Sequence, residues 1–153
     1  MNNIILRNAL IDDELLLYKW RNINELVVLS SKQKKVTFNE HKIWFRKKIQ
    51  DSNCKILIIQ LNEEDIGLIR LEKEDKINCR ISIYLLPGYE GQGHGYVALS
   101  KVINSGIFNC KSYFAEVQNK NIPSQKFFKK LGFSISSTKD KKSILFRRNN
   151  LPV

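Results

Sequence analysis

The sequence predicts an α+β fold in which helices cover both faces of a mixed sheet, giving three layers. Segments that alternate between apolar and polar residues indicate strands, and segments with helical periodicity lie between them. Their order along the chain is strand, two helices, three strands, helix, strand, helix and two strands. The chain has 153 residues, of which 42% are hydrophobic. That is enough for one domain with its own core, spanning residues 1–153.

The N-terminal third begins with a strand over Asn3–Ala9. The acidic run 12–14 follows and favours the start of a helix, because acidic side chains stabilise the positive end of the helix dipole. A polar loop over 30–35 separates this helix from a second one. The second helix starts with the capping box Thr37–Glu40 and is expected to end near residue 51.

The pattern changes at Lys55 to one typical of strands. Lys55–Gln60 is apolar enough for a buried strand, and Asn62–Asp65 has the composition of a turn. The remaining elements are expected to be strands over 66–72 and 78–86, a glycine-rich loop, a helix over 96–108, a strand over 112–117, a helix over 124–131, and strands over 133–137 and 143–148.

The charge balance is strongly basic, with 26 Lys and Arg against 15 Asp and Glu and a net charge of +11. Such an excess indicates an anionic ligand or partner, and a polynucleotide or a phosphorylated small molecule would satisfy it equally. Between Lys126 and Arg148 there are eight basic residues and one acid, Asp140. A solvated, lysine-rich surface explains this tract without any binding function.

The composition disfavours several other classes of protein. No run approaches the ~20 apolar residues of a membrane span, and the first residues lack the charged start and long apolar stretch of a signal peptide. The cysteines Cys54, Cys79 and Cys110 form no CxxC pair, and no metal site is expected from them or from the two distant histidines. An odd cysteine count without a secretion signal favours the reducing cytoplasm over a disulfide framework.

Four of the seven glycines, Gly88, Gly91, Gly93 and Gly95, lie in the loop between the strand 78–86 and the helix 96–108. Without Cβ atoms, successive backbone N–H groups can turn toward one phosphate, and the helix dipole adds positive potential at the same place. The loop is therefore a candidate pyrophosphate site. No Gly-Lys-Ser/Thr follows, so it is not a Walker loop, and its G-x-G-x-G spacing differs from the dinucleotide fingerprint.

This loop is similar to the signature of the GNAT superfamily of acetyl-CoA-dependent N-acetyltransferases, Arg/Gln-x-x-Gly-x-Gly/Ala. Glu90–Gly95 matches it except at the first position. A second signature, Asn-x-x-Ser/Ala-x-x-Leu/Phe-Tyr-x-x-x-Gly-Phe, resembles Asn121–Phe133, with Phe128 in place of the tyrosine. The resemblance implies the three-layer α/β/α GNAT fold, with a twisted, mostly antiparallel sheet that splays between strands 4 and 5.

The same resemblance implies acetyl-CoA as co-substrate, bound by the loop and by the helices that follow it. Glu90 is given no binding role, because a carboxylate beside a pyrophosphate is unfavourable. The residues implied to bind the cofactor are Leu85, Leu86, Gly91, Gln92, Gly93, His94, Gly95, Tyr96, Asn121, Ser124, Phe127, Phe128 and Lys130.

The N-terminal half resembles the branch of the superfamily that acetylates nucleotide-linked 4-amino sugars, as in the pseudaminic-acid pathway. The similarity lies in 19–22, 39–45, 50–53 and Ile66–Arg70. It implies a small-molecule amine as acceptor, a nucleotide-linked amino-deoxy sugar of bacterial surface-glycan biosynthesis. The residues implied to bind it are Trp20, Arg21, Asn22, His41 and Trp44. Packing in a helix core explains the two tryptophans equally well, and a helix surface position is the alternative for His41.

Direct attack of the amine on the thioester in a ternary complex needs a base, an oxyanion donor and an acid. The resemblance points to Glu116 as base, with a solvent-facing strand residue as the alternative, and to a backbone N–H near Leu85 as oxyanion donor. Phe128 occupies the position of the family's usual acid and cannot donate a proton. Tyr84, Ser124 or water is expected to replace it, unless the thiolate leaves unprotonated near the helix dipole.

Two alternative functions remain at this point. The first keeps the fold but acetylates a protein N-terminus or another small amine; a polyamine is disfavoured by the positive charge. The second is a nucleic-acid-binding domain, which is disfavoured because no recognisable nucleic-acid-binding motif is present. A cytoplasmic location without a membrane partner is expected, and a homodimer is compatible with the sequence.

Overall fold

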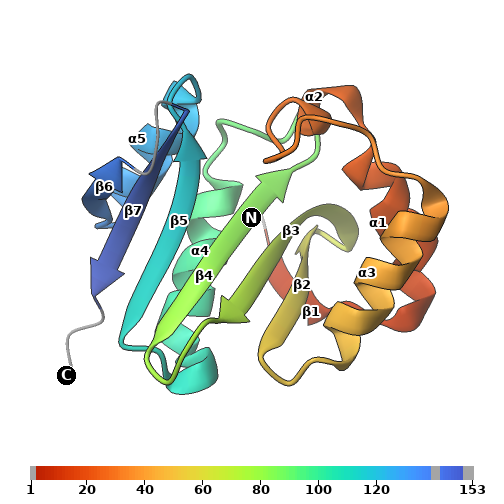
Figure 1. Ribbon diagram of the computed structural model, residues 1–153, viewed down its shortest axis with the longest axis horizontal. Helices are drawn as coiled ribbons and strands as arrows, with labels where there is room; N and C mark the ends of the chain where they lie inside the picture. The colour runs from red at the N-terminus through yellow and green to blue at the C-terminus, as the bar shows by residue number, and fades with distance from the viewer. Residues whose placement is uncertain (1–2, 139–141, 150–153) are drawn as a thin grey trace.

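The computed structural model describes residues 3–138 and 142–149 and arranges them around one seven-stranded sheet (Figure 1). The strand order is β1-β2-β3-β4-β5-β7-β6. All neighbouring strands are antiparallel except β4 and β5, which confirms the expected mixed, mostly antiparallel sheet. The strands are β1 (Ile4–Asn8), β2 (Cys54–Leu61), β3 (Glu64–Lys73), β4 (Asn78–Leu85), β5 (Ser112–Gln118), β6 (Ser134–Thr138) and β7 (Ser143–Asn149).

The parallel neighbours β4 and β5 separate after a short stretch of pairing. They are in register only from Asn78 opposite Ser112 to Arg80 opposite Phe114. Beyond these residues β4 continues to Leu85 and β5 to Gln118, and the two strands diverge toward the top of Figure 1. The expected splay between strands 4 and 5 is therefore present, and it opens at the carboxyl ends of both strands.

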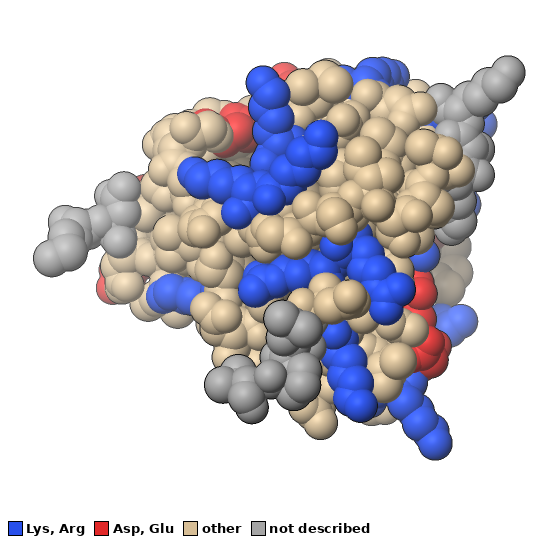
Figure 2. All heavy atoms as spheres, turned by 90° about the vertical axis from the view of Figure 1, so that its left-hand side faces the viewer, with Lys and Arg blue, Asp and Glu red and all other residues tan. Residues whose placement is uncertain are grey.

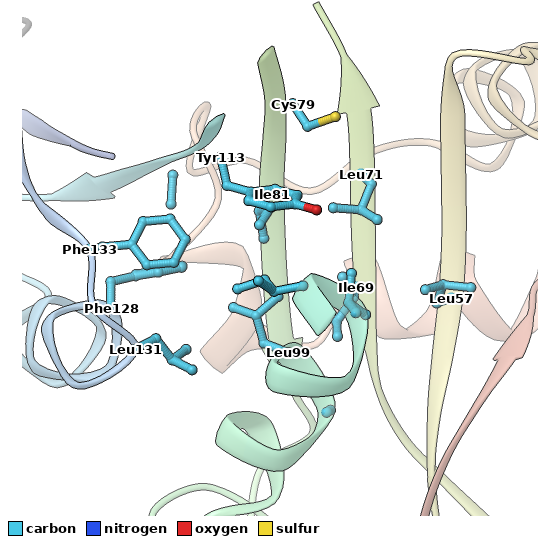
Figure 3. Packing of buried hydrophobic residues seen from close by; sticks show 14 of the residues in the cluster. Leu57, Ile69, Leu71, Cys79, Ile81, Leu99, Tyr113, Phe128, Leu131 and Phe133 are labelled. Atoms are coloured by element: carbon cyan, nitrogen blue, oxygen red, sulfur yellow. The ribbon is translucent and has the colours of Figure 1, made fainter. Parts of the chain in front are cut away.

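Helices cover the two faces of the sheet (Figure 1). One face packs against α1 (Glu14–Arg21) and α3 (Phe38–Gln50), around Leu17, Trp20 and Phe45. The opposite face packs against α4 (His94–Ser105) and α5 (Ile122–Lys130). Figure 3 shows this second core, in which Tyr113 of β5 lies near Ile81 and Leu71. Three short helices complete the fold: η1 (Ile11–Asp13), α2 (Asn24–Val27) and η2 (Ile107–Asn109).

Several expected local features are confirmed. Thr37 Oγ1 accepts a hydrogen bond from the Glu40 N–H, and the Thr37 N–H donates to the Glu40 carboxylate, so the capping box starts α3. The hairpin between β2 and β3 is tighter than expected, because Asn62 and Glu63 both adopt positive φ and close it in two residues. The helix expected to reach residue 108 ends earlier, since Gly106 adopts a left-handed conformation after Ser105.

The expectation of a chain without disulfides is wrong, because Cys79 and Cys110 form a disulfide with their Cα atoms 6.2 Å apart. The N–H groups of Lys111 and Ser112 both donate to the carbonyl of Ile77, and this contact brings the starts of β4 and β5 together. The bridge therefore lies at the end of the β4–β5 pair where the strands touch. Cys54 is a buried free cysteine.

Candidate active site

The glycine-rich loop leads directly into α4, as the sequence predicts. Gly88, Gly91 and Gly93 have φ of 95°, 73° and 85°, in the left-handed region that favours glycine. Gly93 is the residue before the first turn of α4, and its carbonyl accepts the Val97 N–H. The backbone N–H groups of the first helical turn have no partner within the helix, so they are available to an anion. A Cβ at Gly93 would meet no protein atom within 4 Å, so space lies beside it.

Two side chains of this loop fold back onto the loop itself. The Glu90 carboxylate accepts the Gly88 N–H at 2.9 Å, and the Gln92 amide donates to the Gly88 carbonyl at 2.9 Å. Glu90 thus satisfies a loop N–H. His94 is also expected at the cofactor, but the whole residue is only 4% exposed.

The end of β4 directs a backbone donor into the gap between β4 and β5. The Leu86 N–H donates to the carbonyl of Ile66 on the β3 side. Successive N–H groups of a strand point to opposite edges, so the Leu85 N–H points toward β5, where pairing has ended. Gly67 lies opposite Leu85, and a side chain there would collide with the backbone of Tyr84 and Leu85. Sequence reasoning assigned Gly67 no role, although a glycine inside a strand signals close backbone approach.

Helix α5 packs against the first turn of α4. Asn121 caps α5, since its side chain accepts the Ser124 N–H at 3.2 Å. The Phe127 ring lies 3.3 Å from where a Cβ of Gly95 would be, so the glycine permits this contact. The Lys130 ammonium lies 4.9 Å from the Tyr96 ring centroid. The expected cofactor residues of the two helices are therefore brought together beside the loop.

Phe128 is the exception among them. It is 3% exposed and packs edge-on against Phe127 and Phe133 and stacks on Phe146. Its surroundings are those of a core residue, because α5 turns this side chain into the apolar cluster between the helix and the sheet.

On the opposite face of the sheet, aromatic and basic side chains gather between β3, β4 and α1. Tyr84 lies edge-on to Trp20 with ring centroids 6.4 Å apart. Arg70 lies 5.2 Å above the Trp44 ring and pairs with Glu72. We call Arg21, Arg70 and Tyr84, with the two tryptophans, the acceptor cluster.

Within the described part of the chain, the Arg21 guanidinium of the acceptor cluster forms no ion pair with a carboxylate. Burial and the charge of Arg70 both lower the pKa of Arg21. Within the ranges 3–138 and 142–149, the buried Arg21 Nη1 has no hydrogen-bond partner. Burial also raises the pKa of Tyr84, whose hydroxyl consequently stays protonated. An anionic group from a ligand would satisfy Arg21.

Asn22 and His41 are also expected at the acceptor, and their side chains contact other residues of the protein. The Asn22 side-chain amide donates to the Val36 carbonyl and its oxygen accepts the Val36 N–H, both at 2.8 Å, which holds the loop before α3. His41 is 4% exposed, stacks on Phe45 and lies against Tyr18, because α3 turns it toward α1. Burial lowers the pKa of His41. A helix surface position does not fit this buried residue, and among the described residues its Nδ1 has no hydrogen-bond partner.

Glu116 lies on β5, two residues beyond the last pair with β4, and is exposed. Its carboxylate accepts hydrogen bonds from Ser143 at 3.0 Å and from Arg80 at 3.2 Å. Arg80 and Tyr84 alternate with core residues of β4, so both side chains lie on the face of the sheet that carries the acceptor cluster. Glu116 contacts Arg80 and therefore lies on that same face. Nearby, the Gln118 amide donates to the carbonyls of Val28 and Ser30, which fixes the segment after α2 across the gap. Sequence reasoning predicted neither Arg80 nor Gln118, since both contacts join distant parts of the chain.

Three features of this site are those of a protein that binds an acyl-CoA thioester. They are the glycine-rich loop at the start of α4, the gap between β4 and β5, and the Leu85 N–H that points into this gap. Comparison with known families agrees, since residues 3–134 match the family model described as an acetyltransferase (GNAT) domain. The chain belongs to the GNAT acetyltransferase family, whose co-substrate is acetyl-CoA.

Among curated relatives, the chain is similar to Acetyltransferase PseH of Campylobacter jejuni. In one strain the match is 29% identical over 99 residues, 63% of this chain and 59% of that relative. In a second strain it is 28% identical over 120 residues, 78% of this chain and 76% of the relative. The chain thus spans less than two thirds of the first relative's length.

Solved structures share the fold. A domain from Methanocaldococcus jannaschii superposes with a TM-score of 0.88 at 23% identity, covering 98% of this chain and 100% of that one. The structure of Campylobacter jejuni PseH in complex with acetyl coenzyme A has a TM-score of 0.74 at 23% identity, covering 97% and 100%. None of the helices in the described ranges is long and apolar enough to cross a membrane.

Proposed function

We propose that this protein transfers the acetyl group of acetyl-CoA to a primary amine on an anionic acceptor, the 4-amino group of a nucleotide-linked amino-deoxy sugar. The observation that supports this acceptor best is Arg21, a partly buried guanidinium with an unsatisfied Nη1 beside Arg70. Two neighbouring cations favour a phosphate-bearing ligand, because it would supply the missing acceptor atoms and charge. The similarity to PseH supports the same class of acceptor.

The gap between β4 and β5 suits the chemical step. Pyrophosphate on the loop would let the pantetheine arm extend into the gap, so that the thioester carbonyl meets the Leu85 N–H. That N–H would stabilise the oxyanion as the amine attacks from the face that carries the acceptor cluster. The reaction forms the amide C–N bond and breaks the C–S bond, which releases CoA as a thiolate.

Two proton transfers complete the proposal. The exposed carboxylate of Glu116 takes the proton of the attacking amine, directly or through one water. We assign the protonation of the thiolate to Tyr84, because it lies near the end of β4 beside the gap and Phe128 carries no hydroxyl. Burial keeps the Tyr84 hydroxyl protonated by raising its pKa, although the same shift makes it a weaker acid. The enzyme would act in the cytoplasm, where acetyl-CoA is available.

The acceptor is tested with a matched pair of substrates. We expect kcat/KM for a nucleotide-linked 4-amino sugar to exceed that for the same sugar without its nucleotide by about tenfold or more. Arg21→Gln should remove most of this difference by lowering only the first value. Lys47→Gln, which removes a charge from an exposed position on α3, should leave both unchanged. Equal values for the two sugars in the unaltered protein would contradict an anionic acceptor.

A further inference from the structure

Arg80 joins two carboxylates at the point where β4 and β5 separate. Its Nε donates to Glu74 Oε1 at 2.6 Å, and its Nη1 donates to Glu116 Oε2 at 3.2 Å. Glu74 follows the end of β3, and its backbone N–H donates to the carbonyl of Asn78, the first residue of β4. The arginine side chain is therefore anchored at the connection between β3 and β4 and extends from there toward β5.

The Glu116 carboxylate is held at both of its oxygens. Oε2 accepts the hydrogen bond from Arg80 on β4, and Oε1 accepts one from the Ser143 hydroxyl on β7 at 3.0 Å. The two donors thus come from the strands on either side of β5. A rotation of the glutamate side chain would break at least one of these bonds, so together they define where the carboxylate points.

Arg80 can hold Glu116 without giving up its anchor at Glu74. The guanidinium is a planar fork, so its Nε and Nη1 can donate to two different acceptors at the same time. Burial alone would lower the pKa of Arg80, but the hydrogen bonds and charges of Glu74 and Glu116 raise it. The side chain consequently stays a charged donor at any pH at which the protein is folded.

The orientation of Glu116 matters because a general base has to lie within about 2.6–3.2 Å of the atom whose proton it takes. The side chain is 38% exposed, so core packing alone does not fix its rotamer. The hydrogen bonds from β4 and β7 supply the missing constraint. Arg80 stands opposite Phe114 in the last pair of β4 and β5, which sets this constraint at the entrance of the gap.

We propose that Arg80 is a positioning residue for acetyl transfer, which holds the Glu116 carboxylate at the entrance of the gap in the orientation that accepts the proton of the amine. The inference rests on the proposed function, in which Glu116 is the base. It applies to any amine that the enzyme accepts, because the contact involves no part of the acceptor.

The positive charge of this side of the molecule is the alternative explanation for any effect of Arg80. Figure 2 shows the side formed by β6 and β7, where Lys and Arg extend across the middle and Asp and Glu lie toward the edges. Arg147 on β7 is the matched control, since it stands opposite Phe114 and its guanidinium lies 5.2 Å from the centroid of that ring. Its removal changes the charge of the same region equally and keeps the hydrogen bond between Arg80 and Glu116.

Steady-state kinetics with the variants of these residues test the proposal. Arg80→Met should lower kcat about fivefold at neutral pH, and it should leave the calorimetric affinity for CoA unchanged. Arg80→Lys should lose less, because the ammonium remains a charged donor. Ser143→Ala, which removes the donor on the other side of β5, should also lower kcat, whereas Arg147→Met should keep kcat within about twofold.

Combination with Glu116→Gln separates positioning from structural damage. If Arg80 acts through Glu116, Arg80→Met should lower kcat no further once Glu116 is replaced by glutamine. The same loss in both backgrounds, an equal loss in Arg147→Met, or an unchanged kcat in Arg80→Met would overturn the proposal. Full activity in Glu116→Gln would reject Glu116 as the base and the role of Arg80 with it. Failure to acetylate the amino sugar, with another amine showing the expected losses, would reject only the proposed acceptor.

Discussion

The Glu116 carboxylate on β5 and the Arg80 guanidinium on β4 are joined by a hydrogen bond of 3.2 Å. Arg80 stands opposite Phe114 in the last residue pair of the two strands, and Glu116 is two residues farther along β5. The ion pair therefore spans the point where the strands separate. It places the proposed base at the entrance of the gap in which the thioester is expected to lie.

Glu116→Gln should lower kcat at neutral pH by a factor of about 10²–10⁴, because the amide keeps the shape but cannot take the proton of the amine. Activity should recover partly at high pH, where the amine is already neutral. The measurement is free-thiol release from acetyl-CoA against pH. A variant that keeps the unaltered profile would mean that another group, or water alone, accepts this proton.

Gly93→Val is expected to weaken CoA binding by about tenfold or more, because a branched side chain would fill the space beside the phosphate loop. The matched control is Gly106→Val. Gly106 has a similar positive φ and equally open surroundings at the other end of α4. Both variants should lose roughly 1–3 kcal/mol of unfolding free energy from backbone strain. Similar CoA affinities in the two variants would argue against the loop as the pyrophosphate site.

Tyr84→Phe should lower kcat by about 10²-fold with little change in the KM for acetyl-CoA. Burial raises the pKa of Tyr84, so its donor form persists as pH rises, and the unaltered enzyme should lose no activity from this group until the pH exceeds the raised value. Tyr18→Phe, a tyrosine of α1 against Phe38, is the control. Full activity in Tyr84→Phe would assign the proton of the thiolate to water or to the amine.

Phe128→Leu should lower the free energy of unfolding by roughly 1–2 kcal/mol, because it removes a ring from the apolar cluster under α5. We expect kcat to stay within about threefold, since the ring packs against other phenylalanines. Phe146→Leu removes a ring of the same cluster and is the matched control. A large loss of kcat in Phe128→Leu alone, with CoA binding intact, would mean that the ring positions the thioester.

Local signals in the sequence predicted much of this arrangement. The capping box, the strand alternation and the glycine spacing each depend on residues close in the chain. The loop from Gly88 to Gly95 and its helix could therefore be identified before any contact was known.

The contacts that the sequence did not reveal join distant segments. The disulfide links residues 31 positions apart, and Gln118 holds the segment after α2 from 88 positions away. Asn22 and His41 were expected at the acceptor, but packing between α1, α3 and their connecting loop determines where they lie. Arg70 belongs to the acceptor cluster because the register of β3 and β4 places it opposite Ser82.

Acetyl-CoA turnover, followed as free thiol with three classes of amine, tests the central claim most directly. The amines are a nucleotide-linked 4-amino sugar, a peptide with a free N-terminus and spermidine. We predict turnover with the nucleotide-linked sugar at the highest kcat/KM of the three, and its loss in Glu116→Gln at neutral pH. Turnover with the peptide or spermidine, and none with the sugar, would contradict an acceptor that depends on Arg21 and Arg70.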